Sequence, residues 1–128
     1  MKHLLLKKLI KKILINHNLI NEHAETCANA LINAELVGAP SHGLSRLRMY
    51  CERISKKVIN PKPKIKIKKI SQSISHIDAD NSIGFVAADT AIKVGIKNAK
   101  KTGIGLVAVK NSGHYGLSGY YAEQAVKK

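Results

Sequence analysis

The sequence predicts an α+β protein in which a helical part precedes a part built from strands and helices. Apolar residues recur at helical spacing up to about residue 58, and two prolines, Pro61 and Pro63, then interrupt that pattern. Beyond them, short strand-like runs alternate with one long helical run. We therefore expect a helical domain over residues 1–58, a linker over 59–64 and a partial α+β domain over 65–128.

The chain of 128 residues is strongly basic, with a net charge of +14. Such a charge is typical either of a protein that binds nucleic acid or an anionic membrane, or of solvated lysines on exposed faces. The excess is mostly lysine, whereas arginine is the usual reader of bases, and aromatic residues do not interleave with the basic ones. We therefore expect no nucleic-acid partner, and a basic helical module that binds nucleic acid stays the alternative interpretation.

The sequence offers little support for a membrane or metal partner. No apolar run approaches the length of a membrane span, and lysines interrupt the apolar start of the chain. Cys27 and Cys51 fall inside helical patterns and lack the spacing of metal ligands. We expect a cytoplasmic protein with no membrane partner and no metal site, in which both cysteines behave as small buried residues.

Three amphipathic helices are expected before the linker, over residues 2–15, 22–37 and 42–56. Asn21 and Ser41 are residues of the N-capping type, so each should immediately precede its helix. The buried stripe of the third helix should consist of Leu44, Leu47, Cys51 and Ile54.

A second stripe on the third helix carries His42, Arg46, Tyr50 and Arg53. Together with Ser41 this face could bind an anionic substrate, because the planar guanidinium of Arg46 matches a carboxylate. The plainer interpretation is that Ser41 only caps the helix and Arg46 pairs with an acid such as Glu52. Considered alone, these residues favour the plainer interpretation.

Alternating and apolar runs predict the elements beyond the linker. We expect strands over residues 65–68, 73–78 and 104–109, an Asx-type turn over 78–82, a helix over 84–101, and a last helix that begins at Ser118 or Gly119. The long helix should bury its small residues against the sheet: Ala88, Ala91, Ile92, Gly95 and Ala99. The strand over 104–109 is nearly all apolar, which is typical of a strand covered on both faces.

A glycine-rich loop over residues 111–119 joins that strand to the last helix. Strand, glycine-rich loop and helix is the layout of a phosphate-binding site, but Asn111 stands where a G-x-G-x-x-G fingerprint needs its first glycine. His114 lies between glycines in this loop and is the candidate for proton transfer near neutral pH. Its spacing alone is equally compatible with a structural histidine.

Five stretches, taken in order, resemble the malate/L-lactate dehydrogenase family of type 2. They are Gly38-Ala39-Pro40-Ser41-His42-Gly43-Leu44-Ser45-Arg46, then Asn60-Pro61, Asp78-Ala79-Asp80-Asn81-Ser82-Ile83-Gly84, Asn111-Ser112-Gly113-His114-Tyr115-Gly116 and Gly119-Tyr120-Tyr121-Ala122. Ala79 and Ser82 replace glycines of the family pattern. Members include ureidoglycolate, sulfolactate, diketogulonate and piperideine-carboxylate oxidoreductases.

The resemblance implies hydride transfer between NAD or NADP and a 2-hydroxy acid, a 2-oxo acid or a cyclic imine acid. It implies that His114 exchanges the proton, with His42 as the second candidate, and that Ser41 and Arg46 bind substrate. Cofactor contacts would come from Gly116, Gly119 and Tyr120. The implied fold is a helical domain followed by a mixed-sheet NAD(P)-binding domain that is not of the Rossmann type, and the implied assembly is a homodimer.

Family members are longer than this chain, so the resemblance implies a truncated, N-terminal portion of the fold. Most dinucleotide contacts would then lie beyond Lys128, and the strand over 104–109 would be left exposed. We expect a fragment of a longer enzyme, a degenerate non-catalytic product, or one half of a split enzyme. In each case the chain alone should show no measurable turnover.

Overall fold

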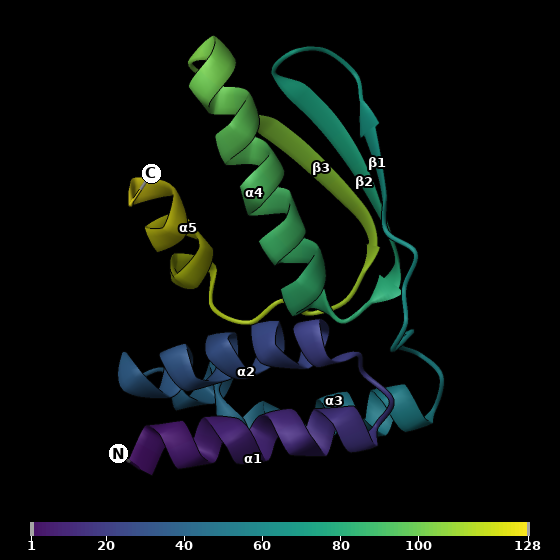
Figure 1. Ribbon diagram of the computed structural model, residues 1–128, viewed down its shortest axis with the longest axis vertical. Helices are drawn as coiled ribbons and strands as arrows, with labels where there is room; N and C mark the ends of the chain where they lie inside the picture. The colour runs from purple at the N-terminus through teal and green to yellow at the C-terminus, as the bar shows by residue number, and fades with distance from the viewer. Residues whose placement is uncertain (1, 128) are drawn as a thin grey trace.

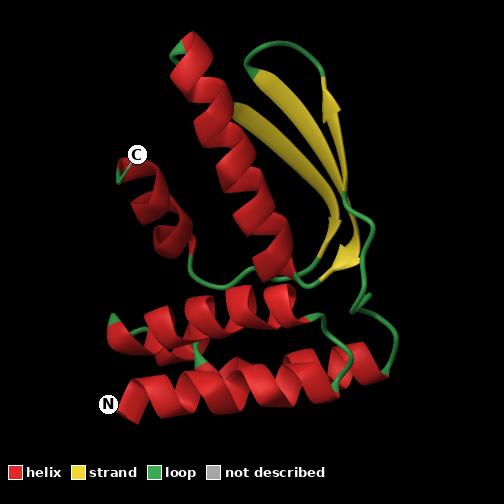
Figure 2. Cartoon of the chain, viewed as in Figure 1, coloured by secondary structure: helices red, strands yellow, loops and turns green. Residues whose placement is uncertain are grey.

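The computed structural model describes residues 2–127 as helices packed with a mixed three-stranded sheet (Figures 1 and 2). Its elements are α1 (Lys2–Asn16), α2 (Asn21–Leu36), η1 (Pro40–His42), η2 (Leu44–Arg46), α3 (Leu47–Ser55), β1 (Lys66–Lys69), β2 (Ile74–Ser82), α4 (Gly84–Thr102), β3 (Leu106–Ser112) and α5 (Ser118–Val126). The α+β class, with a helical N-terminal part, is confirmed. None of the helices in the described residues has the length and apolar character to cross a membrane.

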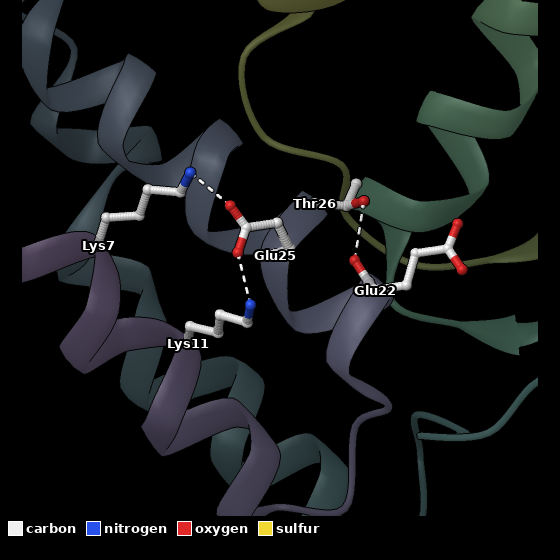
Figure 3. A network of polar contacts seen from close by, with 5 residues as sticks. All are labelled: Lys7, Lys11, Glu22, Glu25 and Thr26. Carbon is white, nitrogen blue, oxygen red and sulfur yellow. Dashed lines mark hydrogen bonds and ion pairs between the residues drawn. The ribbon is translucent and has the colours of Figure 1, made fainter. Parts of the chain in front are cut away.

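The helices α1 and α2 pack as an antiparallel pair at the base of the molecule (Figure 1). Leu14 on α1 and Cys27 and Leu31 on α2 are fully buried in the hydrophobic cluster that these helices contribute to. Across the exposed side of the pair, the carboxylate of Glu25 accepts from Lys7 and from Lys11, whose Nζ lies 2.8 Å away (Figure 3). These bonds, from Lys11 and then Lys7, hold the pKa of Glu25 below its usual range.

The expected cap of α2 is wrong by one position. Ile20 is the residue before the helix, and Asn21 is already helical and makes no side-chain capping bond. Because an apolar residue can precede a helix that packing stabilises, the cap is dispensable here.

The third helix begins later than the sequence predicts. Residues 40–46 form the two short 3₁₀ turns η1 and η2, and α3 starts only at Leu47. Gly43, with φ −99° and ψ −135°, leaves the helical region and separates the turns. Ser41 therefore caps no α-helix. Tyr50 and Ile54 form the buried face of α3, whereas Leu44, Leu47 and Cys51, expected to be buried, are only half-buried.

The sheet has the strand order β1-β2-β3, with β1 antiparallel and β3 parallel to β2. Central Ile77 pairs with Ile67 on one side and Val109 on the other. The middle strand runs to Ser82 and so is longer than predicted. Its last residues contain an irregularity at Asp80, whose φ is +52° and whose N–H donates to Asp78 Oδ1 (3.1 Å), as expected of Asx-type geometry.

The edge of the sheet that β3 forms is open. Leu106 is 55% exposed and Val109 is 39% exposed, and within residues 2–127 only β2 pairs with β3. The predicted burial of this strand on both faces is therefore wrong. The alternative expectation, that a truncated fold leaves the strand exposed, is confirmed. The α4 residues that were expected to be buried against the sheet are likewise only half-buried: Ala88, Ala91, Ile92, Gly95 and Ala99. All of these except Ala99 line an open, largely apolar groove of about 590 Å³ between α4, β3 and α5.

The main hydrophobic cluster joins both parts of the chain. Residues of α1, α2 and α3 share it with Ile83, Phe85 and Val86 at the start of α4. The loop from β3 to α5 runs along this junction, between the first turn of α4 and α2 (Figure 1). The division into domains at residues 58 and 65 stays a prediction.

Gly84, the first residue of α4, is buried where the helix meets the loop that carries His114. A Cβ there would overlap the backbone carbonyls of Gly113 and His114. We predict that Gly84→Ala lowers the free energy of unfolding by about 1–3 kcal/mol, because backbone must move to admit the methyl group. Chemical denaturation measures this, and amide spectra should show residues 113–115 displaced.

Gly119→Ala is the matched control, because a Cβ at Gly119 meets no atom within 4 Å. This exchange at the start of α5 should be neutral or should raise stability by about 0.5 kcal/mol. Equal losses in the two variants would contradict the close approach at Gly84.

The Glu25 ion pairs give a second prediction. Because the folded-state pKa of Glu25 is lowered, its contribution is complete above the unfolded pKa of about 4.3 and is lost as pH falls through the folded pKa. Glu25→Gln should therefore cost about 0.5–1 kcal/mol of unfolding free energy at neutral pH, and this difference should vanish in acid. Glu52→Gln is the control, because it removes an exposed ion pair within α3, and it should lower the free energy of unfolding by less. If the loss of stability in Glu25→Gln persists in acid, it does not come from the ion pairs of Glu25.

Candidate functional site

Two histidines distant in sequence face each other at the junction between the helical layer and the loop after β3. His42 lies at the end of η1 and His114 in the loop, and their rings stack with centroids 5.8 Å apart and planes inclined by 28°. Arg46 ends η2 close by and contributes to the electrostatics of His114. The described structure thus brings together three residues that the sequence analysis named separately.

His114 is held by Tyr50. The Tyr50 hydroxyl lies 2.7 Å from Nδ1 of His114, and the phenol ring is itself packed edge-on against Phe85, with centroids 5.0 Å apart. Burial raises the pKa of Tyr50 above its usual range, so the phenol stays protonated near neutral pH.

The pKa of His114 is shifted in the opposite direction to that of a histidine next to a carboxylate. Partial desolvation lowers it first, and the positive charges of His42, Arg46 and Arg53 lower it further. At neutral pH the ring is therefore mainly uncharged. A neutral imidazole can accept a proton or donate a hydrogen bond, which are the two properties that an acid–base site needs.

His42 is fixed through its own neighbours in the 3₁₀ turns. Ser41 Oγ lies 3.0 Å from Nδ1 of His42, and Nε of Arg46 donates to the Ser41 carbonyl over 2.7 Å. The Nδ1 atoms of both histidines are thus engaged, and their Nε2 atoms make no hydrogen bond to residues 2–127.

Arg46 is exposed and forms no ion pair with the described part of the chain. Glu52, the acid considered as its partner, pairs instead with Arg48 over 2.7 Å. The bond that Arg46 donates uses only Nε, so the two terminal nitrogens of its guanidinium remain available to an anion.

The 3₁₀ turns are anchored by a residue that the sequence analysis missed. Glu35 on α2 accepts the Leu44 N–H over 2.7 Å, and its carboxylate occupies the space that a Cβ at Gly43 would need. No periodicity identifies Glu35, because the contact joins two separate elements. The sequence analysis placed Tyr50 on the second stripe of the third helix, but nothing in its spacing identified His114 as its hydrogen-bond partner.

The loop beyond His114 is shaped by Gly116, Tyr115 and Tyr121. Gly116 has φ +80° and lies against the Phe85 ring, so a side chain would not fit there. The buried Tyr121 hydroxyl donates to the Tyr115 carbonyl over 2.8 Å. These contacts give Gly116 a structural function, and its contact with a cofactor stays a prediction.

The other two proposed cofactor contacts lie on α5. Gly119 has open space around it, and half-buried Tyr120 packs edge-on against Tyr121, with centroids 5.2 Å apart. Their cofactor contacts likewise stay predictions. Residues 2–127 contain no group of three or more His, Cys, Asp or Glu that could hold a metal ion.

Comparisons of this chain with known proteins, by sequence and by structure, point to the same family. The profile described as malate/L-lactate dehydrogenase matches residues 1–128. The chain is 39% identical over 122 residues to L-sulfolactate dehydrogenase of Methanocaldococcus jannaschii, covering 95% of this chain and 36% of that protein. It is 45% identical over 107 residues to malate dehydrogenase of Pyrococcus abyssi, covering 84% and 30%.

The solved structure of malate dehydrogenase from Pyrococcus horikoshii superimposes with a TM-score of 0.91 at 38% identity, covering 94% of this chain and 35% of that one. The chain therefore spans about a third of the length of the relatives that it matches. Sequence profile, identity and fold agree, and the chain belongs to the malate/L-lactate dehydrogenase family.

Proposed function

We propose that this chain carries the substrate-binding and proton-transfer part of an NAD- or NADP-linked oxidoreductase that acts on a 2-hydroxy or 2-oxo acid, or on a cyclic imine acid. The observation that carries the proposal is the pair of facing imidazoles, His42 and His114, next to the unpaired guanidinium of Arg46. The names of the relatives, all dehydrogenases or reductases, support the same chemistry.

The roles follow from the chemistry of each group. Arg46 binds the carboxylate through its terminal nitrogens, and Nε2 of His114 exchanges a proton with the oxygen on C2, or with the ring nitrogen of an imine. Ser41 orients His42, which contacts the same oxygen and is the second candidate for the proton transfer. Fixing the carboxylate and the reacting oxygen together aligns C2 for reaction.

NAD or NADP would supply or accept the hydride, but the residues described here do not fit a whole dinucleotide. The groove between α4, β3 and α5 is lined by glycine, alanine, valine, isoleucine, serine and tyrosine. For a pyrophosphate it offers only the N-terminal end of α5 at Ser118, with no basic side chain beside it. Gly116, Gly119 and Tyr120 remain proposed contacts at its border, and most of the cofactor site is assigned to other polypeptide.

The open edge of β3 and the adjoining groove are the surface on which that polypeptide would pack. We propose as its occupant the counterpart of the two thirds of the relatives that this chain does not match. A strand added to β3 would satisfy its free backbone groups and cover Leu106 and Val109. The completed protein is proposed to be a cytoplasmic homodimer.

Complementation tests this function. We predict no measurable oxidation of NADH or NADPH with oxaloacetate or pyruvate by the chain alone. Co-expression with the unmatched portion of the Pyrococcus horikoshii malate dehydrogenase should give a complex with measurable turnover. Robust turnover by the chain alone would contradict our assignment of the cofactor site to other polypeptide. A stable complex that is inactive both with these 2-oxo acids and with a cyclic imine acid would contradict the proposed reaction.

Variants of the active complex test the individual roles. His114→Asn should lower kcat by about 10²–10⁴-fold, because it removes the proton-transfer group. Arg46→Lys should raise KM most strongly, because a point charge replaces a planar fork. Arg48→Lys is the matched control, since Arg48 pairs with Glu52, and it should leave both constants unchanged. Equal effects at positions 46 and 48 would argue against carboxylate binding by Arg46.

A further inference from the structure

The contact between Tyr50 and His114 has a defined direction. Tyr50 is 1% exposed, and its ring is fixed against Phe85, so its hydroxyl cannot turn to water as a surface phenol would. Among residues 2–127 its one hydrogen-bond partner is Nδ1 of His114, at 2.7 Å.

The groups whose charge affects this phenol do not accept its proton. Cys27 is a buried thiol whose raised pKa keeps it uncharged, and it makes no hydrogen bond to the phenol. Arg46 and Arg53 also lie near Tyr50, and a guanidinium group only donates. Nδ1 of His114 is therefore the acceptor that is available to the phenolic proton. A neutral imidazole nitrogen is also a better acceptor than a phenol oxygen, so donation from Tyr50 to Nδ1 is the favoured arrangement.

A neutral imidazole carries a single N–H, so accepting at one nitrogen fixes the proton on the other. We propose that Tyr50 is a positioning residue whose hydroxyl donates to Nδ1 of His114 and thereby holds the resting imidazole with its proton on Nε2, the atom directed to substrate. This inference rests on the proposed function only for the identity of the group that Nε2 meets, the oxygen or nitrogen at C2 of the acid.

The consequence is that the resting site presents a hydrogen-bond donor. A neutral imidazole N–H can polarise a carbonyl without being a strong acid, so the free protein is preorganised for the 2-oxo acid rather than for the 2-hydroxy acid. When His114 becomes imidazolium, its Nδ1–H can donate to the phenol oxygen, but the phenolic hydrogen then loses its one acceptor among residues 2–127. The contact therefore favours the neutral, Nε2-protonated ring.

Histidine tautomers can be read directly from nitrogen chemical shifts, without any catalytic assay. The wild-type chain, labelled with ¹⁵N and assigned with His114→Gln, should show His114 in the Nε2–H form above neutral pH, with no detectable second tautomer. In Tyr50→Phe the Nδ1–H tautomer of His114 should become detectable, with a population at least several-fold higher than in the wild type. A wild-type ring protonated at Nδ1 would overturn the proposal, as would unchanged His114 shifts in Tyr50→Phe.

Tyr115→Phe is the matched control, because the Tyr115 hydroxyl lies in the same loop but contacts Ser118 Oγ at 3.2 Å. It should leave the His114 tautomer unchanged; an equal effect there would show a general disturbance of the loop and overturn the proposal. The wild-type measurement decides the direction of the bond even if Tyr50→Phe fails to fold. A correct tautomer with an inactive complemented enzyme would reject the proposed function alone.

Discussion

The edge-on contact between Tyr50 and Phe85 joins the helical layer to the sheet layer, and the candidate site depends on it. Phe85 is wholly buried in the first turn of α4, and Tyr50 reaches it from α3. The same Phe85 ring lies against Gly116, so it also sets the path of the loop after His114. One aromatic pair therefore fixes the hydroxyl that holds His114 and the backbone that carries it.

Features that depend on local spacing were predictable from the sequence, and features that depend on tertiary contacts were not. The helices α1, α2 and α4 lie within about two residues of their predicted bounds, because apolar periodicity is a property of neighbouring residues. The predicted start of α3 was wrong for two reasons. Gly43 interrupts the helical backbone, and Glu35 of α2 holds the N–H of the next residue, Leu44. Likewise, His42, His114 and Arg46 were recognisable from residue type and motif, whereas the partner of Tyr50 was not.

The open strand shows a different reason for failure. The composition of residues 104–109 predicts a strand covered on both faces, and the described residues cover it only in part. Apolar composition reports the environment that a segment favours, and that environment can include polypeptide outside the described residues. The chain also matches only about a third of each relative. The exposed apolar strand and this partial match are independent observations, and each supports the proposed occupant of the groove.

Charge balance links substrate binding to the protonation of His114 in the proposed reaction. Arg46 and Arg53 make the free site cationic. Both lower the pKa of His114, as does His42, and Tyr50, being neutral, does not offset them. A carboxylate bound by Arg46 would cancel part of this positive charge, and the pKa of His114 would rise on binding. Substrate would then promote formation of the imidazolium, which donates its proton to the 2-oxo group and is neutral again after that transfer. Loss of the product carboxylate would restore the low pKa of the free site.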